Sequence, residues 1–124
     1  MTRALHHVAL GARDVERVAR FYAQAFDLSE RARHVDGSGD LRSIWLDMSG
    51  VVLMVERTVA ERARVEGVGA GPFLLAFAIE ASERAELEAR LAGLGAPVEA
   101  RTEHTSYFRD PEGHRVALSD YPVG

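Results

Sequence analysis

Residues 73–79 read Phe-Leu-Leu-Ala-Phe-Ala-Ile, and they decide the fold because they begin, for a second time, a pattern that has already run once. The first start is Leu5–Leu10, a short apolar strand candidate bounded by Gly11. An amphipathic segment typical of a helix follows each start, opened by Asp14 in the first copy and by Ser82 in the second. The chain therefore contains an internal duplication.

Three short strand candidates follow each predicted helix. They are Ser29–His34, Arg42–Met48 and Val51–Glu56 in the first copy, and Pro97–Glu103, Thr105–Arg109 and Arg115–Ser119 in the second. Their close spacing predicts antiparallel hairpins, and Asp110-Pro111-Glu112-Gly113 has the residues of a type I turn. The predicted organisation is a single domain over residues 1–124, with repeat one at about 4–56, a linker at about 57–71 and repeat two at about 72–119.

The predicted fold class is α+β. Two βαβββ repeats form one concave mixed sheet, and a helix packs behind each repeat. The opposite, concave face is then free to bind a ligand.

Composition excludes several classes of function. The 124 residues include no cysteine, so there is no disulfide framework and no thiolate metal site. A net charge of -4 argues against a nucleic-acid partner. No apolar run approaches the roughly 20 residues that span a bilayer, and the start of the chain does not resemble a signal peptide. We therefore expect no membrane partner and a cytoplasmic location.

Two motifs carry a resemblance to a known family. One is His6-His7-Val8-Ala9-Leu10 followed by Arg13–Arg17 and Phe21-Tyr22; the other is Tyr107–His114. With them the sequence resembles the vicinal oxygen chelate superfamily, which includes glyoxalase I, extradiol dioxygenases, fosfomycin-resistance enzymes and bleomycin-resistance proteins. The resemblance implies the glyoxalase-like fold, a homodimer and a ligand cup on the concave face.

The resemblance also implies four positions for metal ligands. In this sequence they hold His7, Met54, Leu74 and Ala117. A stable divalent site needs at least three nitrogen or oxygen ligands, so the expectation is no metal and no cofactor. The alternative is a divalent metal held by His7 and Glu56, with His104 as a third donor.

The remaining candidates line the predicted cup. His7 is either a ligand anchor or a general acid/base, and Trp45 lines a wet cavity or an interface. Either Tyr107 or Phe108 faces the cup, and Arg115 either pairs with an anionic ligand or is a solvated rim residue. The full set of predicted ligand-contact residues is His7, Trp45, Met54, Glu56, Leu74, Tyr107, Arg115 and Ala117.

These residues predict a metal-free protein of the bleomycin-resistance type that sequesters a largely apolar small organic compound. The alternative is a lyase, isomerase or dioxygenase of the same superfamily, with His7 as acid/base or as one ligand of an unusual metal site. A third possibility is a purely structural subunit of a larger complex.

Overall fold

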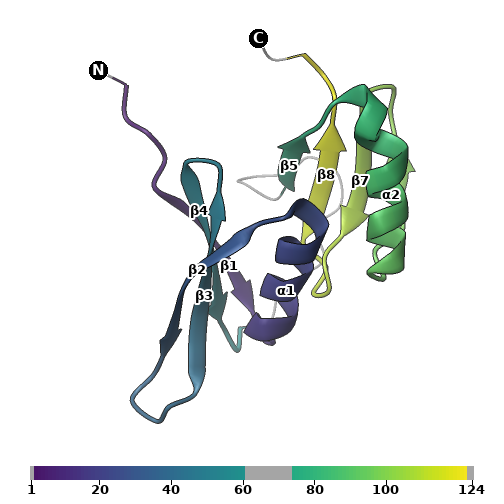
Figure 1. The fold of residues 1–124 in the computed structure, drawn as a ribbon. Coiled ribbons are helices and arrows are strands. Elements are labelled where there is room, and N and C mark those ends of the chain that lie inside the picture. Colours follow the sequence, from purple (N-terminus) through teal and green to yellow (C-terminus); the bar gives the residue numbers. More distant parts are fainter. Residues whose placement is uncertain (1, 61–73, 123–124) are drawn as a thin grey trace. The chain divides into compact units, whose positions relative to one another are not determined.

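The computed structural model describes residues 2–60 and 74–122, and the chain divides into two compact units, Met1–Glu61 and Arg62–Gly124. Each unit has the order strand, helix, three strands (Figure 1). This confirms the predicted α+β class with two βαβββ repeats, each with its own four-stranded mixed sheet. Most of the predicted linker lies outside the described residues.

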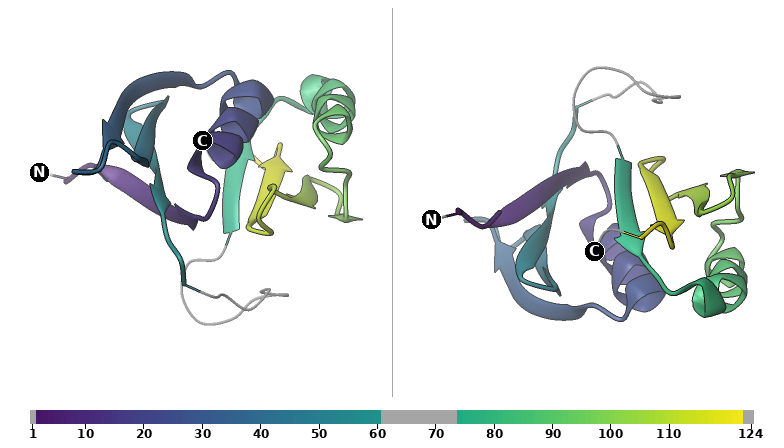
Figure 2. Two further views of the ribbon diagram at one scale, coloured as in Figure 1. Left: turned by 90° about the horizontal axis from the view of Figure 1, so that it is seen from below. Right: turned by 90° about the horizontal axis from the view of Figure 1, so that it is seen from above.

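The first unit has its elements at β1 (His7–Ala12), α1 (Val15–Phe26), β2 (Ser29–Val35), β3 (Leu41–Met48) and β4 (Val51–Arg57). The strands lie in the order β1-β4-β3-β2, with β1 parallel to β4 and the other pairs antiparallel. The sheet is strongly twisted, as the views in Figure 2 show.

Helix α1 covers one face of this sheet. The Asp14 side chain caps the helix by accepting a hydrogen bond from the Arg17 backbone N–H, as the sequence predicted. Arg33 on β2 is the cross-strand partner of Ile44 on β3, so their side chains share one face of the sheet. The Arg33 guanidinium donates to Glu16 of α1, and α1 therefore lies on that face. The core of the unit therefore forms on that face, where the side chains of Ile44, Leu46, Leu53 and Val55 are at most 1% exposed.

The second unit has its elements at β5 (Leu74–Ala78), a 3-10 turn η1 (Ala81–Glu83), α2 (Arg84–Gly93), β6 (Ala100–Arg101), β7 (Thr105–Arg109) and β8 (Arg115–Ser119). Its strand order, β5-β8-β7-β6, matches that of the first unit. Helix α2 lies beside β7 (Figure 1). The predicted bounds of β7 and β8 are confirmed, and Gly113 N donates to Asp110 O at 3.0 Å in the turn between them.

Besides one-residue shifts at the ends of β2, β3 and β4, three larger details differ from the sequence predictions. Strand β1 starts two residues later than expected. It also runs through Gly11 to Ala12, because Thr58 N, just after β4, donates a hydrogen bond to Ala12 O. The helix start in the second unit is fixed by Glu83, whose side chain accepts from Glu80 N at 2.9 Å, and not by Ser82. The strand predicted over residues 97–103 shrinks to two paired residues.

Candidate ligand-binding faces

The helix-free face of the first sheet gathers most of the predicted site residues from that unit. Register places Trp45 beside Met54 on β4, and Met54 beside Ala9 on β1. His7 is two residues from Ala9 and shares its face. His7, Trp45 and Met54 therefore lie together on the face opposite α1, and their role as ligand contacts stays a prediction.

Trp45 is the centre of an aromatic cluster on this face. The His7 ring is nearly parallel to the indole, with centroids 6.5 Å apart, and the His34 ring is tilted at 5.1 Å. His34 also lies within hydrogen-bond distance of Ser43, Nδ1 to Oγ at 3.3 Å. The sequence analysis missed His34, although its two-residue period with Ala32, the cross-strand neighbour of Trp45, places it on the same face.

The indole N–H of Trp45 lacks an acceptor in the part of the chain that the structure describes. Nε1 is buried, and it has no hydrogen-bond partner among the described residues. An unsatisfied buried donor costs about 1–3 kcal/mol, so native proteins rarely leave one without a partner, a water or a ligand.

His6 lies next to this cluster, immediately before β1. Strict alternation predicts that it points away from His7, but His6 precedes β1 and is not bound by the strand geometry. Its Nδ1 lies 2.9 Å from Nδ1 of His7, with the two rings nearly perpendicular. Two adjacent imidazoles thus converge at the start of the first strand.

Glu56 shares the face with His7 but lies at its other end. His7 pairs with Val52, and Glu56 is four residues further along β4, which corresponds to about 13 Å. One metal ion cannot bind both side chains at bond distances near 2.1 Å. The predicted alternative of a metal held by His7 and Glu56 is therefore wrong.

The helix-free face of the second sheet carries the other predicted residues. Tyr107 lies beside Ala117, and Leu74 beside Arg115. Tyr107 rather than Phe108 is on this face, because Phe108 is fully buried beside Val116 on the face toward α2. The Arg115 guanidinium lies 5.1 Å from the Tyr107 ring centroid, a cation–π contact. This face therefore combines an arginine positioned over an aromatic ring with the apolar side chains of Leu74 and Ala117.

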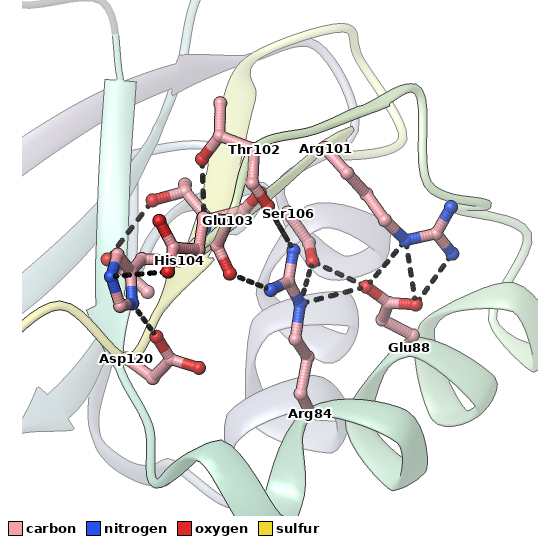
Figure 3. Close-up of polar contacts among 10 residues, drawn as sticks. Arg84, Glu88, Arg101, Thr102, Glu103, His104, Ser106 and Asp120 are labelled. Atoms are coloured by element: carbon pink, nitrogen blue, oxygen red, sulfur yellow. Dashed lines mark hydrogen bonds and ion pairs between the residues drawn. The ribbon is translucent and has the colours of Figure 1, made fainter.

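The opposite face of the second sheet meets α2 through charged side chains (Figure 3). Arg101 donates to Glu88 at 2.7 Å, and Ser106 also donates to Glu88. The hydrogen bonds from Arg101, and then that from Ser106, outweigh the effect of burial and lower the pKa of Glu88 to about 2. Arg84 donates to Ser106 Oγ at 2.9 Å and to three backbone carbonyls of residues 102–105.

His104, the third donor in the alternative metal site, is already paired. Its Nδ1 lies 2.7 Å from the Asp120 carboxylate, and its Nε2 is 3.8 Å from Glu103 (Figure 3). No group of three or more histidine, aspartate or glutamate side chains converges on a metal position within residues 2–60 and 74–122.

The chain is an α+β protein with a duplicated βαβββ architecture and a helix-free face on each sheet. The model of the glyoxalase-like domain family matches residues 7–119, and the chain belongs to this family. This confirms the resemblance to the vicinal oxygen chelate superfamily. No curated protein sequence matches the chain.

Three solved structures illustrate the similarity of fold. A variant of the fosfomycin resistance protein FosX from Listeria monocytogenes, complexed with Mn(II) and 1S,2S-dihydroxypropylphosphonic acid, is 21% identical; the match covers 99% of this chain and 96% of that one, with a TM-score of 0.82. FosX from Mesorhizobium loti is 21% identical over 99% and 95%, with a TM-score of 0.79. The oxidase ChaP-H2 is 22% identical over 100% and 98%, with a TM-score of 0.73.

The expectation of no cofactor is contradicted by these similar structures, because the Listeria FosX complex contains Mn(II). The donors at the four positions carried over from the family nevertheless do not fit that ion. Met54, Leu74 and Ala117 supply no oxygen or nitrogen side-chain donor, while Mn(II) prefers carboxylate and water oxygens. A metal in this chain would need donors at other positions.

Proposed function

We propose that this glyoxalase-like domain binds a small organic molecule on the helix-free face of its first sheet, with the Trp45 indole N–H as a hydrogen-bond donor. The observation that carries the proposal is the buried Trp45 Nε1 without a partner. A ligand oxygen at this place would restore the hydrogen bond that burial otherwise costs.

The neighbours of Trp45 support a flat, largely apolar ligand. Imidazole rings of His7 and His34 lie near the indole, and the apolar Met54 is its neighbour on β4. Aromatic and thioether groups bind planar apolar surfaces, and a small number of polar groups fix the orientation of the ligand. Glu56, in the next row of the sheet, is a half-buried acceptor for a ligand donor.

The second unit contributes predicted contacts of a different kind. Arg115 above Tyr107 favours a ligand with an acidic group, and Leu74 and Ala117 provide apolar surface beside them. The phosphonic acid in the Listeria FosX complex is one such acid. We propose these four residues as ligand contacts on the helix-free face of the second sheet, described by itself.

An enzymatic role is the second candidate, favoured by the contact between His6 and His7. A catalytic imidazole needs a partner that fixes its orientation, and His6 Nδ1 is 2.9 Å from His7 Nδ1. His7 would then act as general acid/base in a lyase, isomerase or dioxygenase reaction of this family. We further propose a homodimer, as the family resemblance implies, and a cytoplasmic location. None of the described helices is long and apolar enough to span a membrane.

Trp45→Phe tests the proposed donor, because it keeps an aromatic ring and removes the N–H. A panel of antibiotics and aromatic acids that includes fosfomycin and bleomycin is screened by thermal shift on the wild type, and hits are titrated calorimetrically. We expect a hit to bind the variant about two- to tenfold more weakly, the value of one hydrogen bond. Tyr121→Phe, which removes a hydroxyl from an exposed ring, is the matched control.

Two results would reject the proposed function. One is a panel in which no compound stabilises the protein. The other is a hit with equal affinity for the wild type and Trp45→Phe, which would remove the indole N–H from the site. Product formation from a bound compound, lost in His7→Ala, would favour the enzymatic role.

A further inference from the structure

Glu56 is a charged side chain on the helix-free face of the first sheet for which the structure shows no counterion. It is half-buried, and within residues 2–60 and 74–122 its carboxylate forms no hydrogen bond or ion pair. Burying a carboxylate costs free energy unless a partner replaces the lost hydration. A positively charged group bound from outside the chain would therefore be stabilised here.

Two arginines near Glu56 are paired with other acids. Arg57, the next residue on β4, donates to the Asp36 carboxylate at 2.7 Å. Arg31 donates at 2.8 Å to Asp47, which shares the helix-free face with Glu56. Neither guanidinium is bonded to Glu56, so this face keeps the negative charge of one carboxylate.

The sheet register places this carboxylate beside the indole donor. Glu56 pairs with Ser43, and Trp45 pairs with Met54 in the next row of the same face. Glu56 and Trp45 are thus diagonal neighbours, a relation that puts two residues about 7–8 Å apart. His34 lies beyond Ser43, two strand spacings or about 10 Å from Glu56. One small ligand can therefore reach both the carboxylate and the indole N–H, while the imidazole is too far away to neutralise the carboxylate.

We propose that the ligand of this face is a flat organic cation, with its positive group against Glu56 and an oxygen acceptor against the indole N–H of Trp45. The charge requirement rests on the proposed function, which supplies the site and the indole donor, and it concerns the first sheet alone. An amidinium or a protonated aminoheterocycle fits, because such a group donates two charge-assisted hydrogen bonds to one carboxylate. The indole ring adds a cation–π attraction that a neutral ligand lacks.

Two probes of the same shape separate the charge of the ligand from its fit. In meta-carbamoylbenzamidine an amidinium and a carboxamide share one ring, and in isophthalamide a second, neutral carboxamide replaces the amidinium. Trp45 is the only tryptophan in the chain, so the protein gives a single indole N–H signal in a proton–nitrogen NMR spectrum. Each probe is titrated into the isotope-labelled full chain, and the shift of this signal gives its dissociation constant.

Glu56→Gln keeps the size of the side chain and removes its charge. Asp47→Asn is the matched control, because Asp47 is an acid on the same face that Arg31 already pairs. We expect the wild type to bind the amidine about five- to tenfold more tightly than isophthalamide, the difference between a charged and a neutral hydrogen bond. The preference should fall to about twofold or less in Glu56→Gln and persist in Asp47→Asn. The same spectra show whether each variant is folded.

Three results would overturn the assignment of a cation. Equal affinity of the wild type for the two probes, with both shifting the indole signal, would reject the charge preference and leave the proposed small-molecule site standing. A preference for the amidine that survives in Glu56→Gln would place the selectivity at another group. An indole signal that neither probe shifts would show that this cation does not bind at Trp45, whatever the antibiotic panel shows for the proposed function.

Discussion

The two units share one topology but join helix to sheet by different physics. The register of each sheet gives the equivalences: Ile44 pairs with Val55, and Val55 with Leu10, while Ser106 pairs with Leu118, and Leu118 with Phe77. Ile44 and Ser106 therefore hold the same position in the two units. The first is a buried aliphatic residue, and the second is a buried hydroxyl bonded to α2.

The helices differ in the same way. In α1 the residues that face the sheet are apolar and almost fully buried, Phe21 and Tyr22 among them. In α2 only Leu91 is buried, while Arg84 and Glu88 reach β7 and the residues before it. The same fold therefore tolerates a hydroxyl with paired charged groups at a position that is aliphatic in the other unit, provided that each buried polar group is paired.

The largest expected effect is on the apolar interface. Ile44→Ser places a serine in the first unit at the position that Ser106 holds in the second. In its described residues, the first unit has no counterpart of the Arg84 and Glu88 contacts that pair the Ser106 hydroxyl. A cavity and an unpaired hydroxyl should cost about 3–5 kcal/mol of unfolding free energy. Urea unfolding followed by Trp45 fluorescence measures this loss in the first unit. A loss below about 1 kcal/mol would mean that the apolar packing of Ile44 is not what holds α1.

The next effect is on the polar interface. Arg84→Ala removes the donor to the backbone carbonyls of Thr102, Glu103 and Thr105. Leaving these acceptors unpaired should cost about 1–3 kcal/mol and speed amide exchange at Thr102 and Thr105. Hydrogen exchange read by NMR resolves the two units. Unchanged exchange there would show that Arg84 does not hold this loop, and exposed Arg42→Ala in the first unit serves as the control.

Acid should weaken the second unit through Glu88. The pKa of about 2 in the folded protein lies below the ordinary value of 4.5 for a glutamate, so the stabilisation is complete above pH 4.5 and is lost as the pH falls toward 2. Allowing for solvent around Arg101, the loss is on the order of 1–2 kcal/mol. The stability gap between wild type and Glu88→Gln should narrow across this window. A gap that stays constant from pH 5 to pH 2.5 would contradict the role of the charge.

The sequence predicted the fold well because its signals are local. The Asp110–Gly113 turn fixes the ends of β7 and β8, and Asp14 with the helical period of Val15, Val18 and Tyr22 fixes α1. Each of these inferences needs only neighbouring residues and the period of one element.

The candidate site was less predictable because it depends on residues distant in the sequence or outside regular structure. The cluster of His34 with Trp45 follows from the pairing of β2 with β3, which bulges interrupt. His6 escapes the strand period because β1 starts at His7. The network of Arg84, Glu88 and Ser106 joins a helix to a strand 18 to 22 residues away, and no local pattern marks that contact.

The smallest expected effect separates an ion pair whose carboxylate is mostly shielded from solvent from one whose carboxylate is exposed. Arg31 and Asp47 lie 2.8 Å apart, much like Arg101 and Glu88 at 2.7 Å, but the Asp47 side chain is 49% exposed and that of Glu88 is 15% exposed. Asp47→Ala should therefore cost no more than about 0.5 kcal/mol, and raised salt should abolish that loss. Urea unfolding of Asp47→Ala and Glu88→Ala at low and high salt makes the comparison. Equal losses for the two variants would mean that shielding the carboxylate from solvent does not strengthen these ion pairs.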